Sequence, residues 1–523
     1  MKLKALLKRT LALAMAAALL SGCTITERIG REEDDGQGQT QPSDGGPGYF
    51  GLAYYASEKV NPVLSVSKIN RILVEALYEG LFVLDGSFQP QPVLCKTYTG
   101  DGTTWTFTLK DGVTFWSGEP LRASDVAYTY KAAMKTPESL YYSRLSEVKS
   151  VEAVSDNEVR IVLKSPNAAL PALLDIPIFR EGTENGDFSE GTGPYQPQSD
   201  GSIRWLVPYK GWHQGALDTF DHIDLVSTVR ADAVVYSFET GDVSLTRADR
   251  ISAAPATFKG AVEVYQTRTS DLHYLGVNCT RAPYQVAAVR QAVSYAFDRA
   301  RLCTTQLQTF ADPAVLPVNP QPEPGGAFLY SVEQDQQRAL KLLADVGVTD
   351  TNGDGVLDYA AADGKRAPLT PVILVNSENT FKVAVTQQII ADLEQIGIRA
   401  TMNALPFEQY QEALSKGEYD FYYGETILSP DFDVRPLIGT GGALNFGACQ
   451  NGMTDGLIAQ MRAAGGDARV DAQRTFYQQF LSTMPVIPIA FTRGQVIARG
   501  GLIEGYKAAP YSMFINVKEW KAG

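Results

Sequence analysis

The alternation of apolar and polar residues along this chain predicts strands, most clearly at residues 104–109. In this segment, TWTFTL, apolar residues alternate with threonines, and the turn dipeptide Asp111-Gly112 follows shortly afterwards. A period of two is typical of a half-buried strand, and Asp-Gly favours a tight hairpin turn. The pattern therefore predicts a hairpin whose return strand contains Val113 and Phe115.

Runs with strand-like or helical periods follow one another along the rest of the chain. Strands are expected at residues 49–55, 152–164 (a strand pair), 203–207, 222–226, 272–278, 371–375, 398–402, 419–423 and 485–491. Helices are expected at residues 69–77, 126–134, 168–174 and 286–302, then in a segment that follows residues 331–334, contains Leu340, Leu343 and Val346 and stops at Gly347, and at residues 381–396, 408–414, 454–464 and 472–484. Ser124 or Asp125 is expected to cap the second helix, and Ser331–Gln334 resembles a capping box for the fifth. Because a helix separates the strands at 371–375 and 398–402, they form a βαβ unit, and the fold class is α/β.

Length and charge limit the possible architectures and partners. The chain has 523 residues, more than one hydrophobic core usually holds, so two or three domains are expected. The formal net charge is -13, although residues 1–23 contribute four basic residues and no acidic one. A surface this acidic repels phosphate groups, which excludes nucleic acid and anionic lipid headgroups as partners.

The N-terminal segment, residues 1–22, has the pattern of a signal peptide. Basic residues precede the apolar run Leu11–Leu20, which is short for a bilayer span of about 20 residues. The Leu-Ser-Gly-Cys sequence that ends at Cys23 resembles a bacterial lipobox, which implies cleavage before Cys23 and acylation of its thiol, with palmitate among the acyl chains. The alternative is a plain secretory signal with a chance cysteine. Residues 23–48 are polar and rich in Gly, Pro and Gln, so we expect a disordered tether.

Several segments occur in an order that resembles one known family. They are LYEGL at 77–81, TFTLKDGVTFWSGEP at 106–120, GTGPY at 191–195, VRQAVSYAFDR at 289–299 and PVIPIAF at 485–491. Together they resemble the extracellular solute-binding proteins of family 5, the peptide and nickel binders of ABC importers. The resemblance extends from about Tyr49 to Lys521.

This resemblance implies a two-lobed, hinge-linked fold of the periplasmic-binding-protein type II. Lobe I would comprise residues 49–270, with an extra subdomain at about 67–185, and lobe II residues 271–488. Residues 489–523 would return to complete lobe I. The crossings between the lobes are expected near Leu275 and Ile487.

The implied function is that of a substrate-binding lipoprotein, not an enzyme. Such a protein captures an oligopeptide or similar small solute between its lobes and delivers it to a membrane permease driven by ATPase subunits. The resemblance implies a monomer, anchored by lipid at the outer face of the cytoplasmic membrane, without a cofactor. A lipid-anchored solute sensor and a surface hydrolase remain as alternatives.

The best candidate for ligand binding is the polar, Gly-rich loop at residues 424–445. In peptide-binding family members, an acid in this loop pairs with the α-amine of the ligand. Here that position falls at Leu428, and Glu425 replaces a common tryptophan, so Asp431 or Asp433 is the expected substitute, unless both simply face solvent. The expected ligand-binding residues are Tyr54, Tyr55, Tyr274, Asn278, Ser429, Asp431, Phe432, Asp433, Arg435 and Asn445. The three tyrosines either stack on the ligand or pack within the lobes.

One loop has the spacing of a calcium site. In DTNGDGVLD at 350–358, the side-chain oxygens belong to Asp350, Asn352, Asp354 and Asp358. Position twelve, where a calcium loop needs a bidentate acid, is Ala361, so an acidic turn without metal is the alternative. The three histidines show no i, i+4 pairing, so no other metal site is expected.

Four cysteines lie beyond the lipobox, namely Cys95, Cys279, Cys303 and Cys449. Their spacings match no zinc or redox motif. Export would permit a disulfide, but the sequence assigns no pair, and buried free thiols are expected.

Overall fold

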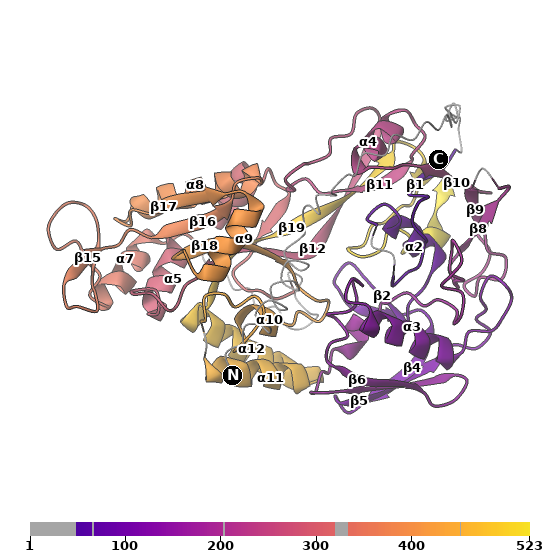
Figure 1. Ribbon diagram of the computed structural model, residues 1–523, viewed down its shortest axis with the longest axis horizontal. Helices are drawn as coiled ribbons and strands as arrows, with labels where there is room; N and C mark the ends of the chain where they lie inside the picture. The colour runs from indigo at the N-terminus through magenta and orange to yellow at the C-terminus, as the bar shows by residue number, and fades with distance from the viewer. Residues whose placement is uncertain (1–48, 65–66, 202–203, 320–332, 450) are drawn as a thin grey trace. The chain divides into compact units, whose positions relative to one another are not determined.

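The computed structural model describes residues 49–523 except 65–66, 202–203, 320–332 and 450 (Figure 1). Several expectations fall outside these residues. They are the signal at 1–22, the lipidation site Cys23, the tether up to residue 48, and Ser331 and Val332 of the capping box. Among the described residues, no helix combines the length and the apolar character that a membrane span requires.

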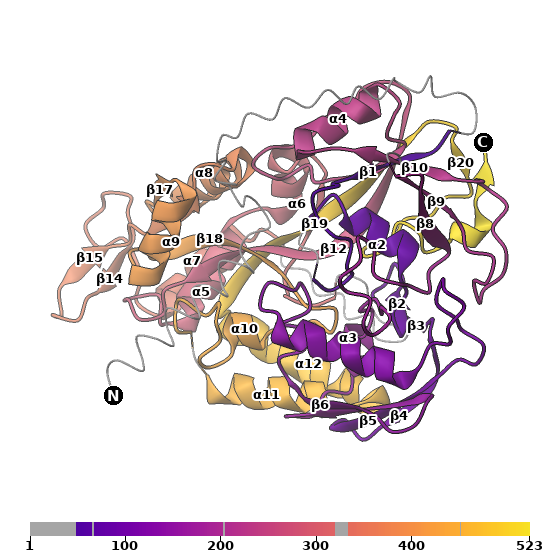
Figure 2. The same cartoon turned by 45° about the vertical axis from the view of Figure 1, so that its right-hand side comes forward.

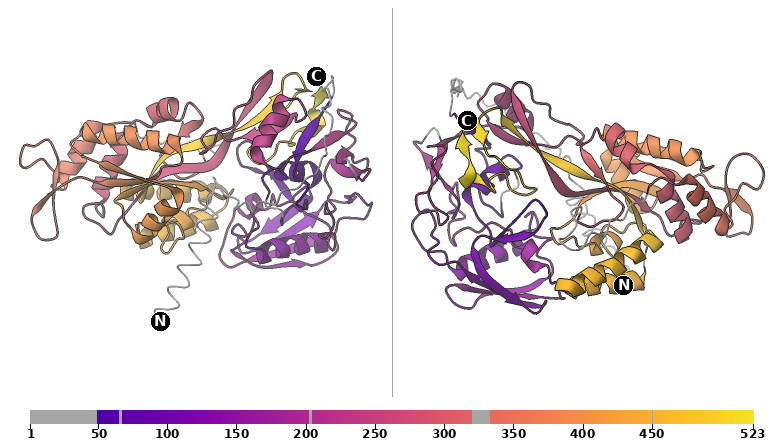
Figure 3. Two further views of the ribbon diagram at one scale, coloured as in Figure 1. Left: turned by 45° about the horizontal axis from the view of Figure 1, so that its top comes forward. Right: turned by 180° about the vertical axis from the view of Figure 1, so that it is seen from behind.

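The described residues divide into two compact units. Unit 1 contains Arg250–Pro255 and Thr269–Arg493, and unit 2 contains Ala256–Arg268, Gly494–Gly523 and the described residues of Arg28–Asp249. Two long strands, β12 (Val262–Val277) and β19 (Val486–Arg499), contribute residues to both units and are neighbours in one sheet (Figure 3). The chain therefore passes between the units within continuous strands.

Unit 2 contains two four-stranded sheets. The first has the order β1 (Gly51–Tyr54), β10 (Ile223–Ser227), β9 (Arg204–Pro208) and β8 (Tyr195–Ser199), in which β1 and β10 are parallel. The second is antiparallel, with the order β4 (Cys95–Gly100), β5 (Thr104–Leu109), β7 (Glu158–Leu163) and β6 (Val148–Ala153). Helix α3 (Ala123–Lys135) packs against β6 and β7 (Figure 2). The remaining elements are α2 (Arg71–Leu77), β2 (Phe82–Leu84), β3 (Pro90–Pro92), a 3₁₀-helix (Leu170–Leu173), α4 (Ala231–Glu239), β11 (Leu245–Ala248), β20 (Ile503–Glu504), a second 3₁₀-helix (Val517–Glu519) and β21 (Lys521–Ala522).

The predicted strand at 104–109 is confirmed, but its return strand is wrong. β5 pairs with β4 and β7, whereas Val113 and Phe115 are buried in the loop that follows it. Tyr209 donates its hydroxyl to the backbone oxygen of Phe115 at 2.7 Å. The alternation at Val113 and Phe115 thus comes from a loop that packs its side chains into the core.

The start of α3 also differs from the prediction. Its N-cap residue is Arg122, and Asp125 lies in the first turn, where its carboxylate accepts the backbone N–H of Arg122 at 2.9 Å. The same carboxylate accepts the backbone N–H of Glu181 at 3.0 Å. Asp125 therefore stabilises the helix start from inside the first turn, and Ser124 is not the cap.

Two loops of unit 2 meet around the buried carboxylate of Glu79, in the segment after α2. It accepts hydrogen bonds from Thr192 Oγ1 at 3.0 Å and Trp212 Nε1 at 3.0 Å. His213 Nε2 and Gln214 Nε2 each lie 3.1 Å from it as well. Because a buried carboxylate is costly unless it is hydrogen-bonded, Glu79 holds both loops against this segment.

The glycines of the GTGPY segment allow a close approach of two backbones. A Cβ on Gly193 would lie 2.4 Å from the carbonyl carbon of Leu77, and a Cβ on Gly191 would lie 2.2 Å from its oxygen. Gly193 also donates its N–H to Leu77 O at 3.0 Å. This approach places Thr192 within reach of Glu79.

The third large sheet has seven strands, and most of them belong to unit 1, whereas β11 and parts of β12 and β19 belong to unit 2. The order is β11, β19, β12, β18 (Phe421–Ile427), β16 (Val372–Asn376) and β17 (Thr401–Leu405), and β13 (Ala311–Pro313) pairs with β19. β16 is parallel to both β17 and β18, whereas β12 is antiparallel to β18. The flanking helices α8 (Thr380–Glu394) and α9 (Phe407–Lys416) pack against β16 (Figure 1). The predicted βαβ unit is confirmed.

The other elements of unit 1 are α5 (Ala287–Ala296), α6 (Arg299–Arg301), a π-helix (Leu302–Gln306), α7 (Gln336–Asp345), β14 (Asp358–Ala360), β15 (Arg366–Pro368), α10 (Arg435–Ile438), α11 (Gly452–Ala463) and α12 (Gly466–Thr483).

The helix predicted over residues 286–302 is interrupted. Phe297 has an extended backbone and separates α5 from α6, and Asp298 caps α6 by accepting the N–H of Arg301 at 3.0 Å. Helix α7 likewise starts from its own cap, Asp335, which accepts the N–H of Arg338. Single capping acids, which the apolar period does not reveal, decide both boundaries.

The two arginines of VRQAVSYAFDR are structural. Arg290 donates to the backbone oxygen of Met484 at 2.9 Å, and Arg299 donates to that of Pro488 at 2.9 Å. Burial lowers the pKa of Arg290 to about 10 and that of Arg299 to about 9. Both guanidinium groups tie the α5–α6 segment to the start of β19.

The cysteines correct one expectation. Cys279 and Cys449 form a disulfide with Cα atoms 5.1 Å apart, whereas Cys95 and Cys303 are buried free thiols. The expectation of free thiols is therefore confirmed for Cys95 and Cys303 and wrong for Cys279 and Cys449. The bonded cysteines are 170 residues apart in sequence, so their spacing carried no signal.

Replacing Gly193 by alanine should destabilise unit 2, because the new Cβ would collide with the Leu77–Tyr78 backbone. We expect the free energy of unfolding to fall by about 1–3 kcal/mol, the usual range for overpacking. Gly86→Ala is the matched control, since a Cβ there meets nothing within 4 Å. Urea unfolding of both variants measures the difference, and equal midpoints would contradict this account of the segment.

Candidate functional site

The parallel strands of unit 1 end together at one edge of the sheet. β16, β17 and β18 run in the same direction, and in open α/β sheets ligands bind outside the carboxyl ends of the strands. The chain that leaves these ends forms the first turn of α8, the first turn of α9 and a long loop. We call residues 376–382, 405–408 and 425–449 the carboxyl edge and treat it as the candidate site.

The loop that follows β18 is attached to β12 at both of its ends. At its start, Ser270 donates its hydroxyl to Leu428 O at 2.8 Å, and Leu428 returns its N–H to Ser270 O at 2.9 Å. At its end, Cys279 donates its N–H to Gly447 O at 2.9 Å beside the disulfide to Cys449. The loop is therefore fixed to the strand that continues into unit 2.

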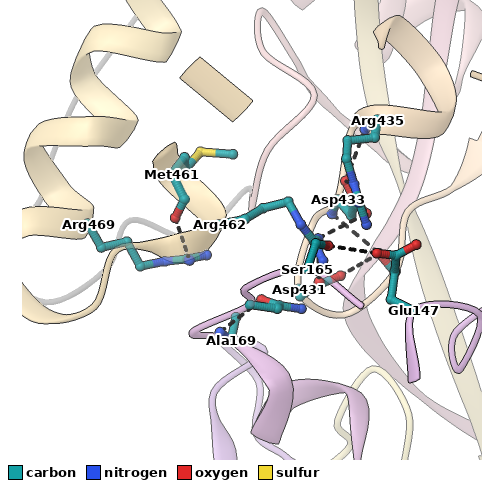
Figure 4. A network of polar contacts seen from close by, with 11 residues as sticks. Glu147, Ser165, Ala169, Asp431, Asp433, Arg435, Met461, Arg462 and Arg469 are labelled. Atoms are coloured by element: carbon teal, nitrogen blue, oxygen red, sulfur yellow. Dashed lines mark hydrogen bonds and ion pairs between the residues drawn. The ribbon is translucent and has the colours of Figure 1, made fainter. Parts of the chain in front are cut away.

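Two acids and one arginine of the loop form a network with a second arginine from α11 (Figure 4). Arg462, from α11, places Nη1 3.0 Å from Asp431 and 2.9 Å from Asp433. Arg435 contacts Asp433 through Nε at 2.9 Å and Nη2 at 2.7 Å. Ser429 donates its hydroxyl to Asp431 at 2.6 Å. Neither acid faces solvent, and each is held by at least one guanidinium group.

Phe432 lies between these two acids in a left-handed conformation, with φ of 53°. Its side chain is buried, and its N–H is donated to Ser429 O at 2.7 Å. A non-glycine residue at positive φ is strained, so the surrounding contacts must hold the turn in place.

A second charged cluster lies on β18 and its neighbours. The ammonium group of Lys382, in the first turn of α8, contacts the carboxylate of Glu425. His273, opposite Glu425 on β12, lies with Nε2 4.0 Å from the same carboxylate and Nδ1 2.9 Å from the Tyr423 hydroxyl. Asp271 belongs to the same cluster and accepts the Thr492 hydroxyl at 3.3 Å.

Burial and charge act in opposite directions on these groups. Burial raises the pKa of Glu425, but the positive charge of Lys382 outweighs burial and holds the pKa of this carboxyl well below its usual range. Burial lowers the pKa of His273 to about 4. At neutral pH the site therefore holds a Lys382–Glu425 ion pair beside an uncharged imidazole.

This second cluster could be mistaken for a metal site. Within the described part of the chain, Asp271, His273 and Glu425 are the one group of possible ligands whose atoms lie within 4.8 Å of one another. Lys382, however, already supplies a positive charge to Glu425. The donor set therefore fits an ion pair better than a metal ion.

Three predicted ligand-binding residues have structural contacts in unit 1. Tyr274 is fully buried, its ring 5.8 Å from that of Tyr422. Asn278 donates its amide to Tyr419 O at 3.1 Å, and Asn445 donates its amide to Gly439 O at 3.1 Å. These contacts hold the backbone of β12, β18 and the loop.

Tyr54 and Tyr55 belong to unit 2. The Tyr54 hydroxyl accepts from Arg204 at 2.5 Å, and its ring stacks on Phe188 with a centroid distance of 5.8 Å. Tyr55 donates its N–H to the Asn70 side chain at 2.9 Å. Tyr54 thus packs within its own unit, which is the alternative to stacking on a ligand that the sequence left open.

In the acidic loop at 350–358, the side-chain oxygens bond to the loop itself. Asp350 accepts the N–H groups of Gly353 at 2.7 Å and Gly355 at 3.0 Å. Asp354 accepts that of Val356 at 2.8 Å, and Asp358 accepts the N–H of Thr351 at 3.0 Å. This arrangement is that of an acidic turn, and calcium binding stays a prediction.

Sequence reasoning missed Lys382 and Arg462, the two cations that hold the acids of the carboxyl edge. An acid inside the strand FYYGETI was a usable signal for Glu425, because a buried carboxylate needs a partner. The sequence did not indicate which residues pair with these acids, because Lys382 lies on α8 and Arg462 on α11, both outside the loop.

Comparisons with known proteins agree with this architecture. The family described as bacterial extracellular solute-binding proteins, family 5 (middle), matches residues 89–443. The chain is 24% identical to the oligopeptide-binding protein AppA of Bacillus subtilis over 80% of this chain and 81% of AppA. The ABC transporter substrate-binding protein CtaP of Listeria monocytogenes superposes with a TM-score of 0.71 and 18% identity, over 91% of this chain and 99% of CtaP. A nickel ABC transporter protein of Bacillus halodurans gives a TM-score of 0.71 and 20% identity, over 89% and 98%. These likenesses confirm the predicted two-lobed, periplasmic-binding-protein-like α/β fold.

Acid should destabilise the protein partly through His273. Its folded pKa of about 4 lies below the ordinary value of 6.5, so between these values the unfolded chain binds more protons. The free energy of unfolding should therefore fall as the pH drops from 6.5 to 4, by about 3 kcal/mol from this group at 1.36 kcal/mol per pKa unit. Denaturant unfolding of the wild type and His273→Gln at a series of pH values isolates the effect. A constant offset between the two curves would contradict it.

Proposed function

Because this chain belongs to family 5 of the bacterial extracellular solute-binding proteins, we propose that it is the substrate-binding lipoprotein of an ABC importer. It captures an oligopeptide or a similar small solute between two lobes and delivers it to a membrane permease, which ATPase subunits drive. The family match over residues 89–443 is the observation that carries this proposal. The similarity to AppA, an oligopeptide-binding protein, supports peptides as the class of solute.

The proposed lobes follow the sequence expectation. Lobe I comprises residues 49–270 and 489–523, with the subdomain at about 67–185, and lobe II comprises residues 271–488. Two of the boundaries between the compact units, at Arg268–Thr269 and at Arg493–Gly494, lie close to these limits and support them. The proposed mechanism is closure of the lobes over the solute, which shifts the population from open to closed.

The proposed contribution of lobe II to binding is the carboxyl edge, including Ser429, Asp431, Phe432, Asp433 and Arg435. The rigid attachment of this loop to β12 supports the assignment, since a fixed loop loses less conformational entropy on binding. Asp431 and Asp433 are each held by arginine, so their proposed role is to orient Arg435, Arg462 and the loop backbone.

A bound solute should close the protein and remain chemically unchanged. We expect native mass spectrometry of the protein purified from its own host to show added mass of a few hundred daltons. Unfolding and refolding the protein releases the solute and gives a ligand-free sample. Adding the solute back to this sample should reduce the radius of gyration measured by X-ray scattering. Identical scattering profiles with and without the solute, or covalent turnover of the solute, would contradict the proposal.

The proposed anchor is the lipidated thiol of Cys23, with residues 23–48 as tether. Cys23→Ser should move the protein from the membrane fraction of its host to the soluble or secreted fraction, because two acyl chains are needed for stable anchoring. Metabolic labelling with palmitate should mark the wild type and not the variant. Equal labelling, or a variant that stays with the membrane, would show that Cys23 is not the anchor.

A further inference from the structure

We infer that the solute presents no ammonium group to the carboxyl edge, because Lys382 and Arg462 already hold the carboxylates that a buried ammonium would need. This inference rests on the proposed function and narrows its substrate class. Among peptides, it selects those whose N-terminus is blocked, for example by an acyl group, over those with a free α-amine.

The first resident cation is Lys382. Its side chain and that of Glu425 are each 11% exposed, and the ammonium group contacts the carboxylate. Lys382 lies in the first turn of α8 and Glu425 two residues before the end of β18, so the pair lies at the carboxyl edge. An incoming ammonium group would have to displace a charge that the fold already positions there.

The second resident cation is Arg462. Its side chain is 6% exposed, and one nitrogen lies 3.0 Å from Asp431 and 2.9 Å from Asp433. Arg435 adds a further guanidinium group to Asp433 at 2.7 Å. Arg435 from the loop and Arg462 from α11 thus bring two positive charges to the carboxylates of Asp431 and Asp433, which are the ones that a cationic ligand would need.

Resident cations have an advantage over a ligand ammonium at these positions. They are already desolvated when the solute arrives, and their side chains are held by folding, whereas an ammonium would lose its water on entry. Removing either resident cation from its acid would also leave a buried charge uncompensated, which is strongly unfavourable.

The exposed acids at the carboxyl edge offer an ammonium group only a weak partner. Glu378 and Glu408 lie beside the first turns of α8 and α9, and both are exposed to solvent. An ammonium group paired with either one would remain largely hydrated, and such surface pairs contribute little. An uncharged end of the solute avoids the desolvation cost altogether.

The test on the wild type uses matched peptides. An equimolar library of lysine-free tripeptides to pentapeptides, half with a free N-terminus and half N-acetylated, is incubated with ligand-free protein. After removal of unbound peptide, native mass spectrometry identifies what remains. We expect the acetylated members to be enriched among the bound peptides.

A variant tests whether Lys382 causes this preference. Lys382→Met, assayed at pH 8 to keep Glu425 ionised, should shift the bound ratio towards free amines by about tenfold, the effect of one hydrogen bond to a charged group. The double variant Lys382→Met/Glu425→Gln should lose that shift. Lys416→Met is the matched control, since Lys416 forms an exposed pair with Glu412 on α9. If thermal melting shows that Lys382→Met does not fold, Arg435→Met, whose side chain is 34% exposed, tests the same shift at Asp433.

The possible results separate this inference from the proposed function. Wild-type protein that retains free-amine peptides as well as or better than acetylated ones overturns the inference and leaves peptide capture intact. An unchanged ratio in the folded cation variant overturns the role of the resident cations. Wild-type protein that retains neither kind of peptide overturns peptide capture, and the inference falls with it.

Discussion

The cost of burying a charged group explains how this chain uses its most recognisable segments. Glu79 is buried and accepts hydrogen bonds from two loops, which joins the segment after α2 to GTGPY. Arg299 is buried and donates to the backbone oxygens of Ala314, after β13, and of Pro488, at the start of β19. In each case a single charged side chain must find fixed partners, and those partners come from distant parts of the sequence. Folding is therefore specified by satisfying a few buried charges as well as by packing apolar faces.

The same constraint operates at the carboxyl edge, the proposed binding region. Ser270 binds Leu428, and Thr269 donates its hydroxyl to Thr492 O at 2.8 Å, so the loop is attached near the place where β12 and β19 pass between the units. Glu425 and Asp431 point inward and are neutralised by cations of unit 1 itself. Charges that are satisfied within the fold keep the side chains of this edge in fixed positions before any ligand arrives.

Regular elements were predictable from sequence where one residue period covers the whole element. The strand at 371–375, its following helix and the strand at 398–402 have such periods; the structure has β16 and α8 at the first two, whereas β17 begins three residues later than predicted, at Thr401. The predictions for Val113 and for the helix across Phe297 were wrong, because loop packing and a single cap residue decide those positions. In the site, the acids were visible in the sequence, whereas their partners lie on other helices. Long-range pairing depends on tertiary contacts, which a local pattern does not contain.

The segments that carry the family likeness and the proposed binding residues lie in different parts of the chain. Gly193 of GTGPY lies against the Leu77 backbone, Thr192 beside it binds Glu79 of LYEGL, and Arg299 of VRQAVSYAFDR binds the backbone of Pro488. By the resemblance described above, Glu425 and Leu428 in the loop at 424–445 stand where peptide-binding family members are expected to have a tryptophan and an acid. A carboxylate introduced into a buried strand is tolerated only with a cation beside it, so Glu425 and Lys382 act as one unit.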